Sequence, residues 1–118
     1  MSGDPEEILK EFDSYYEKMK KDMPEITKAY TEIMKAMYKE GALKPKDKEL
    51  ISLGIAIFAR CEPCIALHVR RALNVGATKE EILSVCAVAI SMGGGPVLVY
   101  IPAVLKSIEK FSRREAGT

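Results

Sequence analysis

Four side chains near the middle of the chain have the types and the spacing that thiol redox chemistry needs. Cys61 and Cys64 form a Cys-x-x-Cys pair. His68 follows this pair by four residues, and Glu49 precedes it by twelve. Two neighbouring thiols can exchange two electrons by forming and breaking a disulfide, and a histidine oriented by a carboxylate can move the proton that a thiol must lose. The pattern therefore predicts a redox-active dithiol, Cys61–Cys64, with a proton relay.

Helical spacing brings three of these side chains to one face. Cys64 and His68 are four residues apart, so they are neighbours on the same face of a helix. Cys61 lies three residues before Cys64, nearer the helix start, where the positive end of the helix dipole favours a thiolate. A disulfide needs Cα atoms roughly 4.4–6.8 Å apart, and a pair at this spacing in a first helical turn can meet that distance.

Two arguments about the attacking thiol point to different cysteines. The helix dipole favours Cys61, whereas the base favours Cys64, because His68 is one turn from Cys64 and about 10 Å along the helix axis from Cys61. A positioned general base contributes roughly 10²–10⁴-fold to a rate. We therefore expect Cys64 to be the base-activated thiol and Cys61 its partner. Glu49 could orient His68 directly or reach Cys64 through a water, and the spacing leaves both routes open.

Helices are expected to position the four residues. Apolar residues recur at helical spacing over residues 8–19 and 26–37, and Asp4 and Pro24 are typical of helix starts. Gly41 is the expected end of the second helix. A third helix over residues 46–59 carries an apolar run that leaves almost no polar face.

Proline, glycine and threonine predict the boundaries of the remaining helices. Pro63 is tolerated in the first turn of a helix, so the cysteine helix should begin near residue 61 and end before Gly76. Thr78 is the expected cap of a fifth helix that continues to the glycines at 93–95. A sixth helix over residues 97–111 should kink or break at Pro102. The expected fold class is all-α, with about six helices.

The apolar third helix also predicts self-association. A helix that is apolar on all sides must be buried on all sides. Its run of ten residues, 50–59, is too short to span a bilayer. A small domain can rarely cover every side of one helix, so we expect a homo-oligomer.

Length and charge exclude several classes of protein. The 118 residues suit one core, so we expect a single domain over residues 1–118. A net charge of +1 with mixed signs gives no reason to expect nucleic acid as a partner, and no segment suggests a membrane span. Residues 1–9 lack the apolar stretch of a secretory signal, so the expected location is the cytoplasm. In a reducing compartment, a Cys-x-x-Cys pair is more often catalytic or metal-binding than structural.

The four residues together reproduce a specific pattern, E-x11-C-x-x-C-x-x-x-H, at Glu49, Cys61, Cys64 and His68. This pattern resembles that of the alkylhydroperoxidase AhpD-like proteins, which belong to the carboxymuconolactone decarboxylase-like superfamily. The resemblance continues through residues 74–82, which look like the helix–turn–helix after the motif. It covers about residues 24–104.

The resemblance implies an all-helical fold that assembles into trimers or hexamers. It also implies a peroxidase with no bound cofactor, whose dithiol reduces hydroperoxides and is re-reduced by an external thiol donor such as a lipoyl-bearing protein. The residues matching Glu49 and His68 relay a proton from the residue matching Cys64, and the resulting thiolate attacks the peroxide oxygen. The residue matching Cys61 then resolves the sulfenic acid to a disulfide.

The residues between the cysteines depart from the family pattern. Glu62 and Pro63 stand where the best-known peroxidases of the family carry a small residue and a histidine. An acid beside Cys61 disfavours a thiolate, which puts the peroxidase rate and the electron donor in question but leaves the dithiol intact. The superfamily's decarboxylases lack the cysteine pair, so lactone decarboxylation is disfavoured.

Three alternatives remain beside the peroxidase. The first is a zinc site built from the same four residues, although ligands seven residues apart on a straight helix spread too far for a closed tetrahedral site. The second is a pair of incidental buried thiols. The third is a non-catalytic redox sensor or oligomeric binding protein, in which the disulfide forms reversibly without turnover. Cys86 lies in an apolar segment and is expected to be an inert core thiol.

Overall fold

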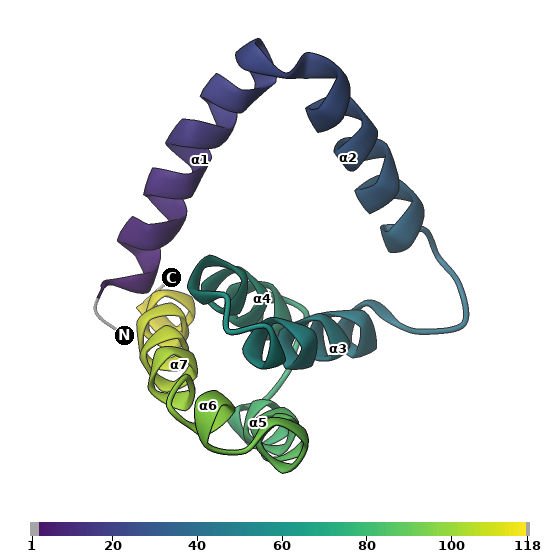
Figure 1. Cartoon of the computed structure of the whole chain (residues 1–118). Helices are drawn as coiled ribbons and strands as arrows, with labels where there is room; N and C mark the ends of the chain where they lie inside the picture. Colours follow the sequence, from purple (N-terminus) through teal and green to yellow (C-terminus); the bar gives the residue numbers. More distant parts are fainter. Residues whose placement is uncertain (1–2, 118) are drawn as a thin grey trace.

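Helices make up most of the chain in this computed structural model, which describes residues 3–117 (Figure 1). Six helices have 13 to 18 residues, and α6 is a single turn of four. No strand occurs in that range, so the all-α prediction is confirmed. The helices are α1 (Pro5–Asp22), α2 (Pro24–Tyr38), α3 (Pro45–Phe58), α4 (Glu62–Asn74), α5 (Lys79–Gly93), α6 (Gly95–Leu98) and α7 (Ile101–Gly117).

Local sequence signals set most of the helix starts. The Asp4 side chain accepts a hydrogen bond from the Glu6 backbone N–H at 2.8 Å and so caps α1. Thr78 and Glu81 form the predicted capping box of α5, with distances of 2.9 and 3.1 Å. Each cap satisfies backbone donors that the first turn of a helix leaves without a partner.

The end of α2 differs from its prediction. The helix stops at Tyr38, because Lys39 adopts an extended backbone with ψ of 147°, and Gly41 lies beyond the helix in the loop. Lys48 of α3 donates from Nζ to the carbonyl oxygens of Met37 (2.6 Å) and Lys39 (2.9 Å). A lysine from another helix thus satisfies carbonyls at this terminus, which no local pattern could have predicted.

The predicted break near Pro102 is present but falls earlier in the chain. Residues 99 and 100 separate α6 from α7, and Pro102 is the second residue of α7. A proline fits the first turn of a helix because its missing N–H would have no partner there. A side chain at Gly93 would overlap with that of Val97, so this glycine permits the close approach of α6 to α5.

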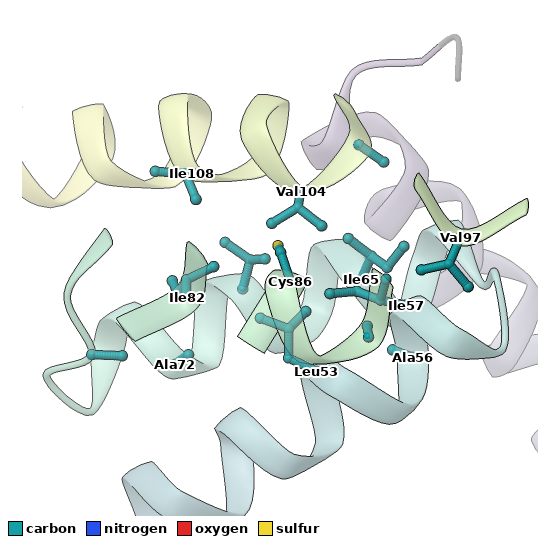
Figure 2. Packing of buried hydrophobic residues seen from close by; sticks show 14 residues of the cluster. Leu53, Ala56, Ile57, Ile65, Ala72, Ile82, Cys86, Val97, Val104 and Ile108 are labelled. Carbon is teal, nitrogen blue, oxygen red and sulfur yellow. The ribbon is translucent and has the colours of Figure 1, made fainter. Parts of the chain in front are cut away.

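A single apolar cluster holds α3, α4, α5 and α7 together (Figure 2). Cys86 lies within it, only 3% exposed, and burial raises the pKa of its thiol. The prediction of an inert core thiol is therefore supported by its position. The largest fully buried apolar side chains of the cluster are Leu53, Ile57, Ile65, Val69, Ile82 and Val104.

Helices α1 and α2 project from this bundle as two arms of a V (Figure 1). Along α2 only Thr27 is buried, and Ile26 and Ile33 are each about 60% exposed. The single chain does not cover α3 on every side, since Ile55 is 65% and Phe58 52% exposed, and the predicted oligomer stays a prediction. Among residues 3–117, no helix is both long enough and apolar enough to cross a membrane.

One ion pair joins the start of the chain to its last helix. Lys110 of α7 donates from Nζ to Asp4 Oδ2 at 2.9 Å. This hydrogen bond is the main reason why the pKa of Asp4 lies below its ordinary value of 3.8.

The Asp4–Lys110 pair should therefore make a pH-dependent contribution to stability. A carboxyl group with a lowered pKa in the folded protein stabilises the fold above its unfolded pKa, and the effect is lost as the pH falls through the folded value. Asp4→Asn keeps a capping oxygen and removes the charge. The melting temperature of wild type should exceed that of Asp4→Asn at pH 6, and the difference should be smaller at pH 3 because more of the Asp4 carboxyl is then protonated. Equal differences at both pH values would contradict a role for the charge.

Candidate active site

The turn between α3 and α4 fixes the position of Cys61. The backbone N–H of Cys61 donates to the carbonyl of Ala56 at 3.1 Å, and that of Arg60 donates to Ile57 at 3.0 Å. These are the two hydrogen bonds of a Schellman motif, which ends a helix with one residue in the left-handed region. Arg60 is that residue, with φ of +57°. The same motif ends α4, where Gly76 takes the left-handed position with φ of +93°.

Substitutions at these two matched turns should change stability in opposite directions. Arg60→Gly should stabilise the protein by about 0.5–1 kcal/mol, because a side chain makes the left-handed conformation costly. Gly76→Ala should destabilise it by about 1–2 kcal/mol for the same reason, and open space around Gly76 removes steric overlap as an explanation. Urea denaturation of the oxidised variants measures both changes. A loss of stability in Arg60→Gly would mean that the Arg60 side chain has a stabilising role of its own.

Cys61 and Cys64 are joined by a disulfide at the N-terminus of α4. Their Cα atoms are 5.2 Å apart, within the range expected for this bond. Cys61 is the N-cap residue, and its sulfur also accepts a hydrogen bond from the Cys64 backbone N–H at 3.3 Å. Both residues are partly buried. The first turn of α4 therefore holds both sulfurs where backbone N–H groups and the helix dipole favour a negative charge.

Glu49 and His68 meet across two helices. His68 Nδ1 lies 2.8 Å from Glu49 Oε1, and the Glu49 side chain is 4% exposed. An ionised carboxylate can only accept hydrogen bonds, so Nδ1 carries the hydrogen and Nε2 is the nitrogen able to take a proton. Of the two routes open from the sequence, the structure thus contains the direct contact between Glu49 and the imidazole. Cys64 shares a face of α4 with His68, one turn away.

Two further residues belong to this hydrogen-bonded network and carry no signal in the spacing of the motif. Tyr38, the last residue of α2, donates from its hydroxyl to Glu49 Oε2 at 2.6 Å. Arg71 of α4 donates from Nη1 to the Tyr38 oxygen at 2.9 Å. The pKa of Tyr38 is raised, first by burial and then by its bond to Glu49. A tyrosine at a helix end and an arginine one turn after the motif look like ordinary surface residues until the helices are assembled.

The donor set does not take the form of a metal site. Each sulfur is bonded to the other, and Glu49 and His68 are paired through Oε1 and Nδ1. In the part of the chain that the structure describes, no group of three or more histidine, cysteine, aspartate or glutamate side chains is arranged to hold a metal ion.

Comparison with known proteins identifies the family to which this fold and site belong. Residues 24–107 match the carboxymuconolactone decarboxylase family. The chain belongs to this family. Within the family it is AhpD-like, because it carries the cysteine pair together with Glu49 and His68. The family includes enzymes as well as these AhpD-like members.

Solved structures of the family share both fold and length with the chain. A family protein from Legionella pneumophila, solved in its apo form, is 36% identical, with a TM-score of 0.88 over 94% of this chain and 99% of that one. A family protein from Thermotoga maritima with a suggested role in the antioxidative response is 30% identical, with a TM-score of 0.73 over 78% of this chain and 95% of that one. An uncharacterized protein of Cupriavidus necator is 32% identical over 89% of this chain and 93% of its own length.

Proposed function

We propose that the protein is a thiol-dependent peroxidase that reduces alkyl hydroperoxides through Cys61 and Cys64. The observation that carries the proposal is the disulfide at the start of α4, with His68 one helical turn after Cys64 and paired with the buried Glu49. The suggested antioxidative role of the Thermotoga maritima relative supports it. The network supplies what a thiol nucleophile needs, namely a base, a group that orients the base, and a second thiol in reach.

The oxidative half-reaction starts from the reduced dithiol. His68 Nε2 takes the proton of Cys64, and Glu49 stabilises the imidazolium that forms. The Cys64 thiolate attacks the terminal, hydroxyl-bearing oxygen of the peroxide, the O–O bond breaks, and the alkoxide leaves as the alcohol after taking a proton from His68. Cys64 becomes a sulfenic acid, which the Cys61 thiol converts to the disulfide with release of water. The peroxide gains the two electrons that the dithiol loses.

An external dithiol then regenerates the enzyme. One thiolate of the donor attacks the disulfide to give a mixed disulfide, and its second thiol displaces the protein cysteine. A lipoyl-type donor fits, because its two thiols complete this exchange within one molecule. No bound cofactor is required at any step.

A steady-state assay with dihydrolipoamide and tert-butyl hydroperoxide tests the proposal. Peroxide-dependent oxidation of the dithiol, catalytic in protein, is the expected result. A matched thiol titration in denaturant should count three thiols in the reduced protein and one, Cys86, after one equivalent of peroxide, since the sequence has three cysteines. A disulfide that forms and is reduced without turnover would instead support a redox sensor.

We also propose that the protein functions as a homo-oligomer. The chain has an apolar groove of about 500 Å³ between α3 and α5, lined by residues such as Ile51, Ile55, Val88 and Met92. It also has an uncovered apolar stripe on the projecting helix α2, which includes Ile26 and Ile33. Both surfaces leave large apolar side chains open to solvent, and a second copy of the chain supplies an apolar partner for each.

Charge substitution on α2 separates assembly from folding. Ile33→Glu should convert the oligomer to monomers while leaving the helical content unchanged, because Ile33 is 63% exposed in the single chain and contributes little to its core. Lys28→Glu, on an exposed and already charged position of the same helix, is the control. Light scattering after gel filtration measures the mass of each. A monomeric wild type at the same concentration would contradict the proposal.

A further inference from the structure

We infer that Tyr38 is a positioning residue of the relay, whose hydroxyl holds the second oxygen of Glu49 and so keeps that carboxylate directed at His68. Tyr38 lies on α2, outside the cysteine motif and 11 residues before Glu49. The inference rests on the proposed function for its effect on rate, and on the geometry alone for its effect on His68.

The two oxygens of Glu49 are held from two different helices. Oε1 meets His68 Nδ1 of α4 at 2.8 Å, and Oε2 accepts from the Tyr38 hydroxyl of α2 at 2.6 Å. With 3% of the residue exposed, solvent has little access to replace either donor. A carboxylate held at both oxygens has a fixed plane, whereas one held at a single oxygen can rotate away from the imidazole.

The neighbours of the Tyr38 hydroxyl determine the direction of its hydrogen bond. Arg71 has only donors, and its Nη1 lies 2.9 Å from the phenol oxygen, so that oxygen accepts from Arg71. The single phenol hydrogen is therefore available to Glu49. The Arg71 guanidinium also lies over the Tyr38 ring, 5.6 Å from its centroid, which restrains the ring. Because the pKa of Tyr38 is raised, the phenol keeps its hydrogen well above neutral pH.

A separate contact fixes the end of the helix that carries Tyr38. Lys48 of α3 precedes Glu49 and binds the carbonyls of Met37 and Lys39, the residues on either side of Tyr38. Adjacent residues of α3 thus hold the backbone and the side chain at the end of α2. The relay consequently depends on an arm that otherwise projects from the bundle (Figure 1).

Tyr38→Phe tests the inference, because it removes the hydroxyl and keeps the ring. His68 is the only histidine, so the ¹⁵N signals of its ring report its tautomer without ambiguity. In the oxidised wild type, the neutral ring should carry its hydrogen mainly on Nδ1. Tyr38→Phe should give a mixture of the two tautomers of His68. It should also lower the kcat of peroxide reduction by about 10-fold and leave the KM for the thiol donor unchanged. Arg71→Met should change the tautomer ratio of His68 and the rate of peroxide reduction in the same direction as Tyr38→Phe, but by a smaller amount.

Tyr15→Phe is the matched control, since it removes an exposed phenol on α1 and should leave both quantities unchanged. A folded Tyr38→Phe variant with the wild-type tautomer would overturn the inference, even if its rate were lower, because packing alone could then explain the loss. If Tyr38→Phe does not fold, a wild-type tautomer in Arg71→Met would overturn it. If Tyr38→Phe shifts the tautomer of His68 but the wild-type protein shows no peroxide turnover, the role of Tyr38 in positioning Glu49 would be upheld and the proposed peroxidase activity refuted.

Discussion

Cys64→Ser is expected to abolish the reaction with hydroperoxide, whereas Cys61→Ser is expected to react once and then stop. Cys64 shares a helical face with His68, so its loss removes the base-activated nucleophile and should lower the rate by at least about 10³-fold. Cys61→Ser keeps that nucleophile but lacks the resolving thiol. Its Cys64 should therefore remain as a sulfenic acid.

Trapping with dimedone and mass spectrometry distinguishes the two variants. After one equivalent of peroxide, Cys61→Ser should carry one adduct on Cys64, and Cys64→Ser should carry none. Steady-state turnover should be absent from both. Cys86→Ala is the control, because Cys86 is a free buried thiol outside the disulfide and its loss should leave turnover intact. A sulfenic acid on Cys61 in the Cys64→Ser variant would reverse the assignment and favour the dipole over the base.

His68→Ala should lower the rate of peroxide reduction by roughly 10²–10⁴-fold, the usual contribution of a general base. Glu49 keeps its hydrogen bond to Tyr38 in this variant, so the buried carboxylate retains a partner and the fold should persist. Added imidazole should restore part of the rate, because it can occupy the space left by the side chain and take the same proton.

Glu49→Gln provides the complementary test. The amide keeps the shape of the carboxylate but cannot stabilise an imidazolium, and it can present a donor to Nδ1 and so favour the wrong tautomer. We expect a loss of about 10²-fold or more. For both variants, rates should be measured under conditions where reduction of the disulfide is not limiting, with circular dichroism to check the fold.

A His68→Ala variant that turns over at the wild-type rate would refute the proton relay.

Local sequence determined most of the elements and the candidate site. The capping box at Thr78 and Glu81, the cap at Asp4 and the stop at Gly76 each depend on a few neighbouring residues, and each occurs where it was predicted. Cys61 and Cys64 were predicted to be close for the same reason, since one helical turn fixes the distance between them.

Only the tertiary structure decided which residues from different helices meet. Glu49 is separated from His68 by 19 residues, and its direct contact with the imidazole depends on how α3 crosses α4. Tyr38 lies at the end of α2, three residues before the predicted glycine, and reaches Glu49 because Lys48 of α3 binds the backbone on either side of it. Which sides of α3 stay uncovered likewise depends on which helices lie beside it, and the apolar run alone did not show that Ile55 and Phe58 would be exposed in the single chain. Spacing along one helix is set by backbone geometry, but contacts between helices are set by packing, which depends on the whole chain at once.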